Sequence, residues 1–180
     1  MKRFALLLTL ILGLHTLSSA QEIDKHNFEG GVSITSYTTL FAIVDGLGTH
    51  YDGKGLYFEY RYNVTDYIDF GGKLYYQYST GRSAPTGTPI SNITYNQIGI
   101  KGFADLNILP GKKVCPYVGV SIGGTNNITN GRNRFLGIIS PRIGVEVWRI
   151  RAAIELDYLY EPNYGIKHEK QLSLNIGFVF

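Results

Sequence analysis

Hydrophobic and polar side chains alternate along the last ten residues of the chain, 171–180. One face of this segment carries only large apolar side chains, namely Leu172, Leu174, Ile176, Phe178 and Phe180. The opposite face carries Ser173, Asn175 and Gly177, and only Val179 breaks its pattern. Because successive side chains of a strand point to opposite faces, the segment predicts an amphipathic strand. About ten residues is also the length of a tilted strand that crosses a bilayer.

The same alternation predicts seven more strands upstream, near residues 28–36, 55–62, 67–78, 93–106, 115–123, 135–148 and 152–160. The connections between them alternate in length. Residues 63–66, 107–113 and 149–151 form short turns, whereas residues 37–54, 79–92, 124–134 and 161–170 are long and rich in Gly, Asn, Thr and Ser. This pattern predicts an all-β fold, an eight-stranded antiparallel up-and-down transmembrane β-barrel with turns at one end and loops at the other.

The polar faces of these strands carry charged side chains. They are Glu59, Arg61, Asp69, Lys73, Lys101, Asp105, Arg142, Glu146, Glu155 and Asp157. A basic residue facing lipid near the bilayer midplane costs about 2–4 kcal/mol, so we expect these side chains to point into the barrel. The interior of an eight-stranded barrel is just wide enough for side chains to fill it. The charges therefore predict a packed lumen network, with a proton or ion path through it as the alternative.

Aromatic side chains gather at strand ends on the apolar face, at Tyr60 and Tyr62, Tyr76 and Tyr78, and Tyr158 and Tyr160. Tyr and Trp girdles mark the two interfaces of membrane proteins. A soluble lipocalin-like barrel is the structural alternative, and it would turn the apolar face inward and the charged face to water. The aromatic positions, and the lack of a Gly-x-Trp motif near the first strand, favour the membrane barrel.

The first twenty residues have the pattern of a secretory signal peptide. Lys2 and Arg3 precede an apolar run over 4–14, and small residues stand at 18–20. We therefore expect residues 1–20 to be removed and residues 21–180 to form the barrel domain. Cys115 is the only cysteine, so no intramolecular disulfide is possible.

The remaining composition narrows the function classes. Without Lys2 and Arg3, the 17 basic residues fall to 15 against 14 acidic ones, a formal charge of +1. This balance gives no basis for binding nucleic acid. The chain carries 14 Tyr and 22 Gly with only 17% charged residues, which is typical of a membrane barrel. No motif indicates a metal site or a cofactor.

The histidines are the candidate catalytic groups of this chain, since some small outer-membrane barrels modify lipids. His50 and His168 fall in the first and last long connections, and His26 precedes the first strand. His50 and His168, with Asp45 or Asp52 and a loop serine such as Ser79 or Ser83, allow a Ser-His-Asp arrangement, but no local motif supports one. We therefore assign no catalytic residue. A lipid-modifying enzyme acting on lipid A or phospholipid is the alternative to a non-enzymatic surface protein.

In strand number, loop alternation and terminal Phe, the chain resembles the small outer-membrane barrels of the OmpA/OmpX type, without a peptidoglycan-binding domain. The resemblance implies an integral protein of the bacterial outer membrane with both termini in the periplasm. It implies contact with outer-membrane lipid and lipopolysaccharide, and insertion by the barrel assembly machinery, which reads the terminal strand. It also implies four extracellular loops that present groups such as Tyr51, Arg134 and Lys167 to an extracellular ligand.

Overall fold

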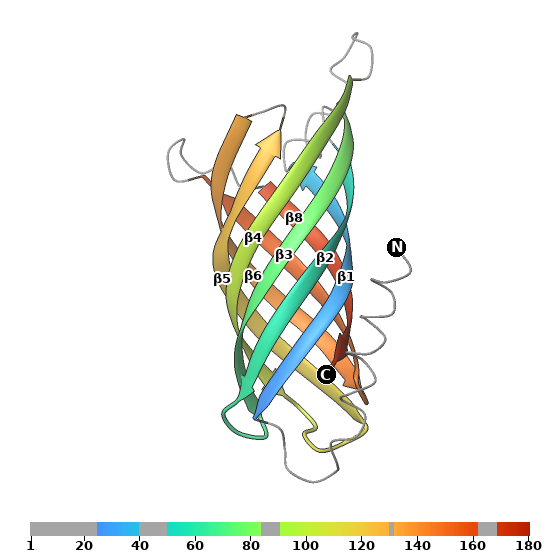
Figure 1. The fold of residues 1–180 in the computed structure, drawn as a ribbon, viewed down its shortest axis with the longest axis vertical. Coiled ribbons are helices and arrows are strands. Elements are labelled where there is room, and N and C mark those ends of the chain that lie inside the picture. The colour runs from blue at the N-terminus through green and yellow to red at the C-terminus, as the bar shows by residue number, and fades with distance from the viewer. Residues whose placement is uncertain (1–24, 40–49, 84–90, 130–131, 162–168) are drawn as a thin grey trace, which may run out of the picture.

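A computed structural model describes residues 25–39, 50–83, 91–129, 132–161 and 169–180 (Figure 1). These residues form eight strands: β1 (His26–Thr39), β2 (His50–Asn63), β3 (Ile68–Ser83), β4 (Ser91–Asn107), β5 (Val114–Thr129), β6 (Arg132–Val147), β7 (Ile150–Tyr160) and β8 (Glu169–Val179). Each strand pairs antiparallel with its neighbours in sequence, and β1 pairs with β8 to close the barrel. The predicted fold class is confirmed. Among the described residues, no helix is long and apolar enough to cross a membrane.

The two ends of the barrel differ. Residues 64–67, 108–113 and 148–149 connect strands at one end, here named the turn end. Residues 40–49, 84–90, 130–131 and 162–168 connect them at the other, the loop end, and lie outside the described part of the chain, as do residues 1–24 with the predicted signal peptide. The chain closes at the turn end, where the Phe180 backbone N–H donates to the Phe28 carbonyl oxygen at 2.8 Å.

The strands run further toward the loop end than the sequence predicts. β5 continues to Thr129 and β6 begins at Arg132, so the predicted long connection 124–134 is wrong. Polar residues of this segment belong to a strand and face the lumen, since Thr125 and Asn127 are buried inside the barrel. Asn127 donates to the hydroxyl of Tyr95 at 3.2 Å.

Other predicted boundaries shift by smaller amounts. His26 is the first residue of β1 rather than a residue before it, and Tyr51 and Arg134 lie in strands rather than in loops. The last short turn is Trp148–Arg149, not 149–151. Trp148 has a φ of 57° in this turn, in the left-handed region that residues other than Gly rarely adopt.

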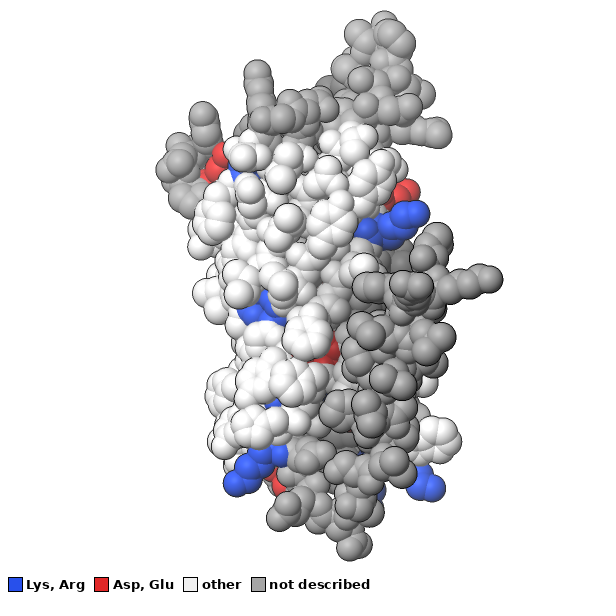
Figure 2. Space-filling model, viewed as in Figure 1, with Lys and Arg blue, Asp and Glu red and all other residues white. Residues whose placement is uncertain are grey.

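The exterior of the barrel is apolar. On β8, Leu172, Leu174, Ile176 and Phe178 are 40–50% exposed, whereas Ser173 and Asn175 on the opposite face are buried. Phe180 is half-buried. In the view of Figure 2, much of the described exterior is uncharged. Because the charged faces point inward, the soluble lipocalin-like alternative is wrong.

Aromatic rings fill part of the interior by lying against glycines of the neighbouring strand. A Cβ atom at Gly99 on β4 would lie 2.4 Å from the ring of Tyr75 on β3, and one at Gly31 on β1 would lie 2.5 Å from the ring of Tyr57 on β2. Both tyrosines are buried. At these two positions a larger residue would displace the ring, so the absence of a side chain is part of the packing.

Candidate functional site

The structure places the ten predicted lumen charges on the inner wall of the barrel. Nine of them are at most 4% exposed, and the Glu146 side chain, near the turn end, is 28% exposed. They come from β2, β3, β4, β6 and β7, two from each strand. The period-2 pattern puts each of them on the inner face, and closure of the barrel brings residues that are distant in sequence within ion-pair distance.

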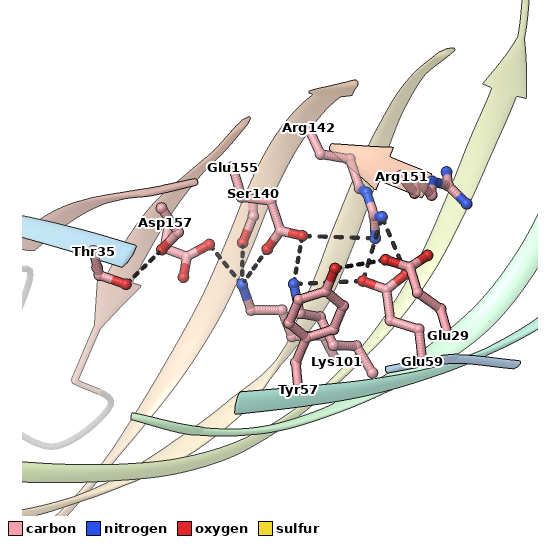
Figure 3. A network of polar contacts seen from close by, with 12 residues as sticks. Glu29, Thr35, Tyr57, Glu59, Lys101, Ser140, Arg142, Arg151, Glu155 and Asp157 are labelled. Atoms are coloured by element: carbon pink, nitrogen blue, oxygen red, sulfur yellow. Dashed lines mark hydrogen bonds and ion pairs between the residues drawn. The ribbon is translucent and has the colours of Figure 1, made fainter. Parts of the chain in front are cut away.

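Two lysines, Lys101 and Lys73, form the centre of this lumen network. Figure 3 shows Lys101 beside Asp157, Glu155 and Ser140. The ammonium of Lys101 lies 2.6 Å from Asp157 Oδ1, 3.0 Å from Glu155 Oε2 and 3.3 Å from the Ser140 hydroxyl. The ammonium of Lys73 lies 2.8 Å from Glu155 Oε1 and 3.4 Å from Glu59 Oε1. Glu155 therefore links the two lysines across the lumen.

Arginines continue the network toward the turn end. Arg142 lies 3.2 Å from Glu59 and 3.4 Å from Asp105, and Arg151 lies 2.6 Å from Asp105. The Arg151 guanidinium also stacks 3.6 Å from the ring centroid of Tyr117, a cation–π contact. Each of these guanidinium groups is buried, so its charge is balanced by carboxylates and aromatic rings rather than by water.

The last layer of the network is built on Arg61. Its guanidinium donates to Glu29 and to Glu146, both at 2.9 Å. The hydroxyl of Tyr57 donates to the other oxygen of Glu29 at 2.6 Å. Asp69, at the same end, has a hydrogen bond from Asn107 at 2.9 Å, while its Oδ1 atom has no partner.

Two members of the network were missed by sequence reasoning. Glu29 lies beside Phe28 on β1, and Arg151 was assigned to a turn, yet both are buried in the lumen. The alternation of side chains along each strand could have identified both residues as lumen residues. Glu29 alternates with the outward residues Phe28 and Gly30, and Arg151 has the same parity as Glu155 and Asp157.

Most of the described lumen side chains toward the loop end are neutral, with the Arg134–Glu161 ion pair near the strand ends. Gln171 donates to Gln77 at 2.9 Å, and the hydroxyls of Thr35 and Ser173 lie 3.3 Å apart. The apolar side chains Leu136, Ile138 and Leu159 are also buried inside, each at most 1% exposed. Sequence reasoning missed these three because it treated the polar face of β6 and β7 as polar throughout.

The residues considered for catalysis are not brought together by the described part of the structure. Ser79 belongs to β3 and is buried in the lumen, where Gln77 donates to its hydroxyl at 3.2 Å, so the assignment of Ser79 to a loop is wrong. His26 lies at the turn end, 2.7 Å from the Tyr60 hydroxyl. Asp45 and His168 lie outside the described residues, as do the side chains of His50 and Ser83. Within the described ranges no cluster of His, Cys, Asp and Glu is arranged to hold a metal.

Comparisons with known proteins find matches in structure alone. No family model matches the chain, and no curated protein matches it in sequence. Among solved structures, the chain is similar to neisserial surface protein A, with a TM-score of 0.59 and 13% identity over 88% of this chain and 98% of that one. It is also similar to the N-terminal β-barrel domain of Pseudomonas aeruginosa OprF (TM-score 0.50, 18% identity, 86% and 97% of the two chains). The outer membrane protein OprG from Pseudomonas aeruginosa matches with a TM-score of 0.50 and 11% identity over 86% and 95%.

These matches define the class of the molecule. The chain has the fold of the small eight-stranded outer-membrane barrels, as its OmpA/OmpX-type strand pattern predicted. At these identities the likeness concerns the fold, and the activity has to be argued from the residues of this chain.

Proposed function

We propose that this chain is an integral protein of the bacterial outer membrane whose sealed barrel holds the loop end at the cell surface for interaction with other molecules. The apolar exterior supports residence in lipid, because a belt of exposed Leu, Ile, Val and Phe side chains would be costly in water. The loops then face the outside, and both termini lie in the periplasm.

The observation that supports this proposal is the burial of the described lumen side chains along the barrel. Charged side chains are paired across the turn-end half, and Leu136, Ile138 and Leu159 pack in the loop-end half. Barrels that conduct freely are larger, with about 16–18 strands. A filled lumen argues for a scaffold rather than a channel, and against a continuous proton or ion path.

Conductance measurements test the sealed lumen. Purified protein inserted into planar bilayers should show no steady open channel, and the same preparation should migrate as a folded, heat-modifiable band. Large, reproducible conductance steps from that folded protein would contradict the proposal.

The partners follow from this placement. Lipid and lipopolysaccharide would surround the exterior, the barrel assembly machinery would insert the chain, and an extracellular ligand would bind at the loops. Comparing adhesion of cells with and without the gene, and with individual loops shortened, tests the surface role. A defined change in lipid A or phospholipid acyl chains that depends on His50 or His168 would instead establish the lipid-modifying alternative.

A further inference from the structure

The turn end of the barrel contains a polar cavity that the scaffold role does not use. Its volume is about 460 Å³, within the range of small-molecule sites. The turn over residues 110–113 forms one side, and Arg61, Asp69 and Glu146 lie among its lining residues. At roughly 30 Å³ for each water molecule, the cavity has room for a ligand the size of a dipeptide.

The inner part of this cavity has more carboxylates than cations. Its buried side is lined by two carboxylates, Asp69 and Glu146, and one cation, Arg61, whose guanidinium is shared with Glu29 outside the lining. Asp69 has no ion pair among the described residues. Asp69 is 2% exposed, and its Oδ1 atom has no hydrogen-bond partner. A buried carboxylate without a cation is costly, so a positively charged group of a ligand would be stabilised here.

The outer part of the cavity carries the opposite charge. Lys112 and Lys113 belong to the turn between β4 and β5 and are exposed, and one exposed carboxylate, Asp66, lies with them among the lining residues. Three asparagines also line the cavity and are held by neighbours: Asn27 donates to Asn63 at 3.4 Å, and Asn107 donates to Asp69 at 2.9 Å. The lining is therefore net negative on the barrel side, where two carboxylates face Arg61, and net positive at the rim, where two lysines outnumber Asp66.

We infer that this turn-end cavity binds a small zwitterionic ligand of the amino acid or short-peptide class, with its ammonium group toward Asp69 and its carboxylate toward Lys112 and Lys113. A bare metal ion fits less well, because the described residues offer no cluster of three metal-ligating side chains. The rim lysines would also repel a cation that carries no negative group.

Cys115 makes the inference testable. It is the only cysteine of the chain, it is half-buried, and it lines the same cavity. A bound ligand should therefore slow its alkylation by a neutral reagent such as iodoacetamide. The measurement uses the full barrel folded in detergent, with glycylglycine as the probe. N-acetylglycylglycine, which lacks the ammonium group, and glycylglycinamide, which lacks the carboxylate, are the matched controls.

Saturating glycylglycine is expected to slow alkylation of Cys115 about tenfold, as occupancy of about 90% would require. Each blocked analogue should protect much less. No protection by glycylglycine up to about 100 mM, or equal protection by all three compounds, would overturn the inference. Protection by magnesium chloride but not by glycylglycine would overturn it in favour of a metal site.

Variants locate the charges that bind. Asp69→Asn keeps the size of the side chain and is expected to abolish protection by glycylglycine. The double variant Lys112→Gln/Lys113→Gln should reduce protection to the level seen with glycylglycinamide. Asp52→Asn, on an exposed residue near the loop end, should leave protection unchanged. Full protection in a heat-modifiable Asp69→Asn protein would overturn the assignment of Asp69.

Discussion

Lys101 on β4 and Asp157 on β7 meet inside the barrel at 2.6 Å, although β5 and β6 separate their strands in the wall. Both side chains are at most 3% exposed. Among the described residues Lys101 is the only ion-pair partner of Asp157, while Lys101 also contacts Glu155. The pair therefore links two distant strands in the buried interior of the barrel.

A double-mutant cycle on this pair should show strong coupling. Lys101→Met leaves two buried carboxylates without this cation and is expected to lower the free energy of unfolding by about 3–5 kcal/mol. Asp157→Leu should lower the free energy of unfolding by less, because Lys101 still has its ion pair with Glu155. The double variant should lose clearly less free energy of unfolding than the two single variants lose together. Urea unfolding in detergent micelles measures all three. Additive losses would show that the two charges do not stabilise each other.

Two glycines of β4 provide a matched test of the interior packing. Gly99 faces the lumen under the Tyr75 ring, and a Cβ atom there would lie 2.4 Å from it, whereas a Cβ atom at Gly102 would meet no heavy atom nearer than 3.9 Å. Gly99→Ala is expected to destabilise the barrel by about 1–3 kcal/mol through overpacking. Gly102→Ala should be neutral or slightly stabilising, since Gly is about 0.5–1 kcal/mol worse than Ala within a strand. Equal effects in urea unfolding would contradict the ring–glycine packing.

A charged side chain on the outward face of the terminal strand should destabilise the barrel, and more so the nearer it lies to the bilayer midplane. Leu174→Arg and Ile176→Arg each place a charge on the apolar exterior, at an expected cost of up to about 2–4 kcal/mol near the midplane. Leu174→Met and Ile176→Met are the controls and should fold as the parent does. The readout is folding into lipid vesicles, followed by heat-modifiable migration. If the Arg variants were as stable in vesicles as the Met variants, the exterior would not be facing lipid.

The aromatic residue at position 180 should matter more for insertion than for stability. The Phe180 ring packs 5.5 Å from the ring centroid of Phe178 in an edge-to-face arrangement. Phe180→Ala is therefore expected to fold in detergent with a loss of about 1 kcal/mol, yet to insert poorly in cells if the assembly machinery reads this residue. The measurement compares detergent refolding with the amount in the outer-membrane fraction. Normal insertion in cells would contradict a role in assembly.

The strand pattern was predictable because it is a local property. Period-2 alternation assigns each side chain of a strand to one face, and the cost of a charge in lipid decides which face points inward. Lumen residues such as Glu59 and Lys101, and outward residues such as Leu172 and Ile176, could thus be separated from the sequence. The prediction failed at 124–134, where Thr125 and Asn127 are residue types typical of loops but lie in a strand and face the lumen.

The pairing of the charges was decided by the tertiary structure alone. The register and the closure of β1 on β8 determine which residues lie at the same height, and neither follows from alternation within one strand. They bring Lys101 to Asp157 and leave Asp69 beside the turn-end cavity. The sequence therefore determined which residues enter the lumen, whereas the contacts within it, and the cavity below them, arise from distances that exist only once the barrel has closed.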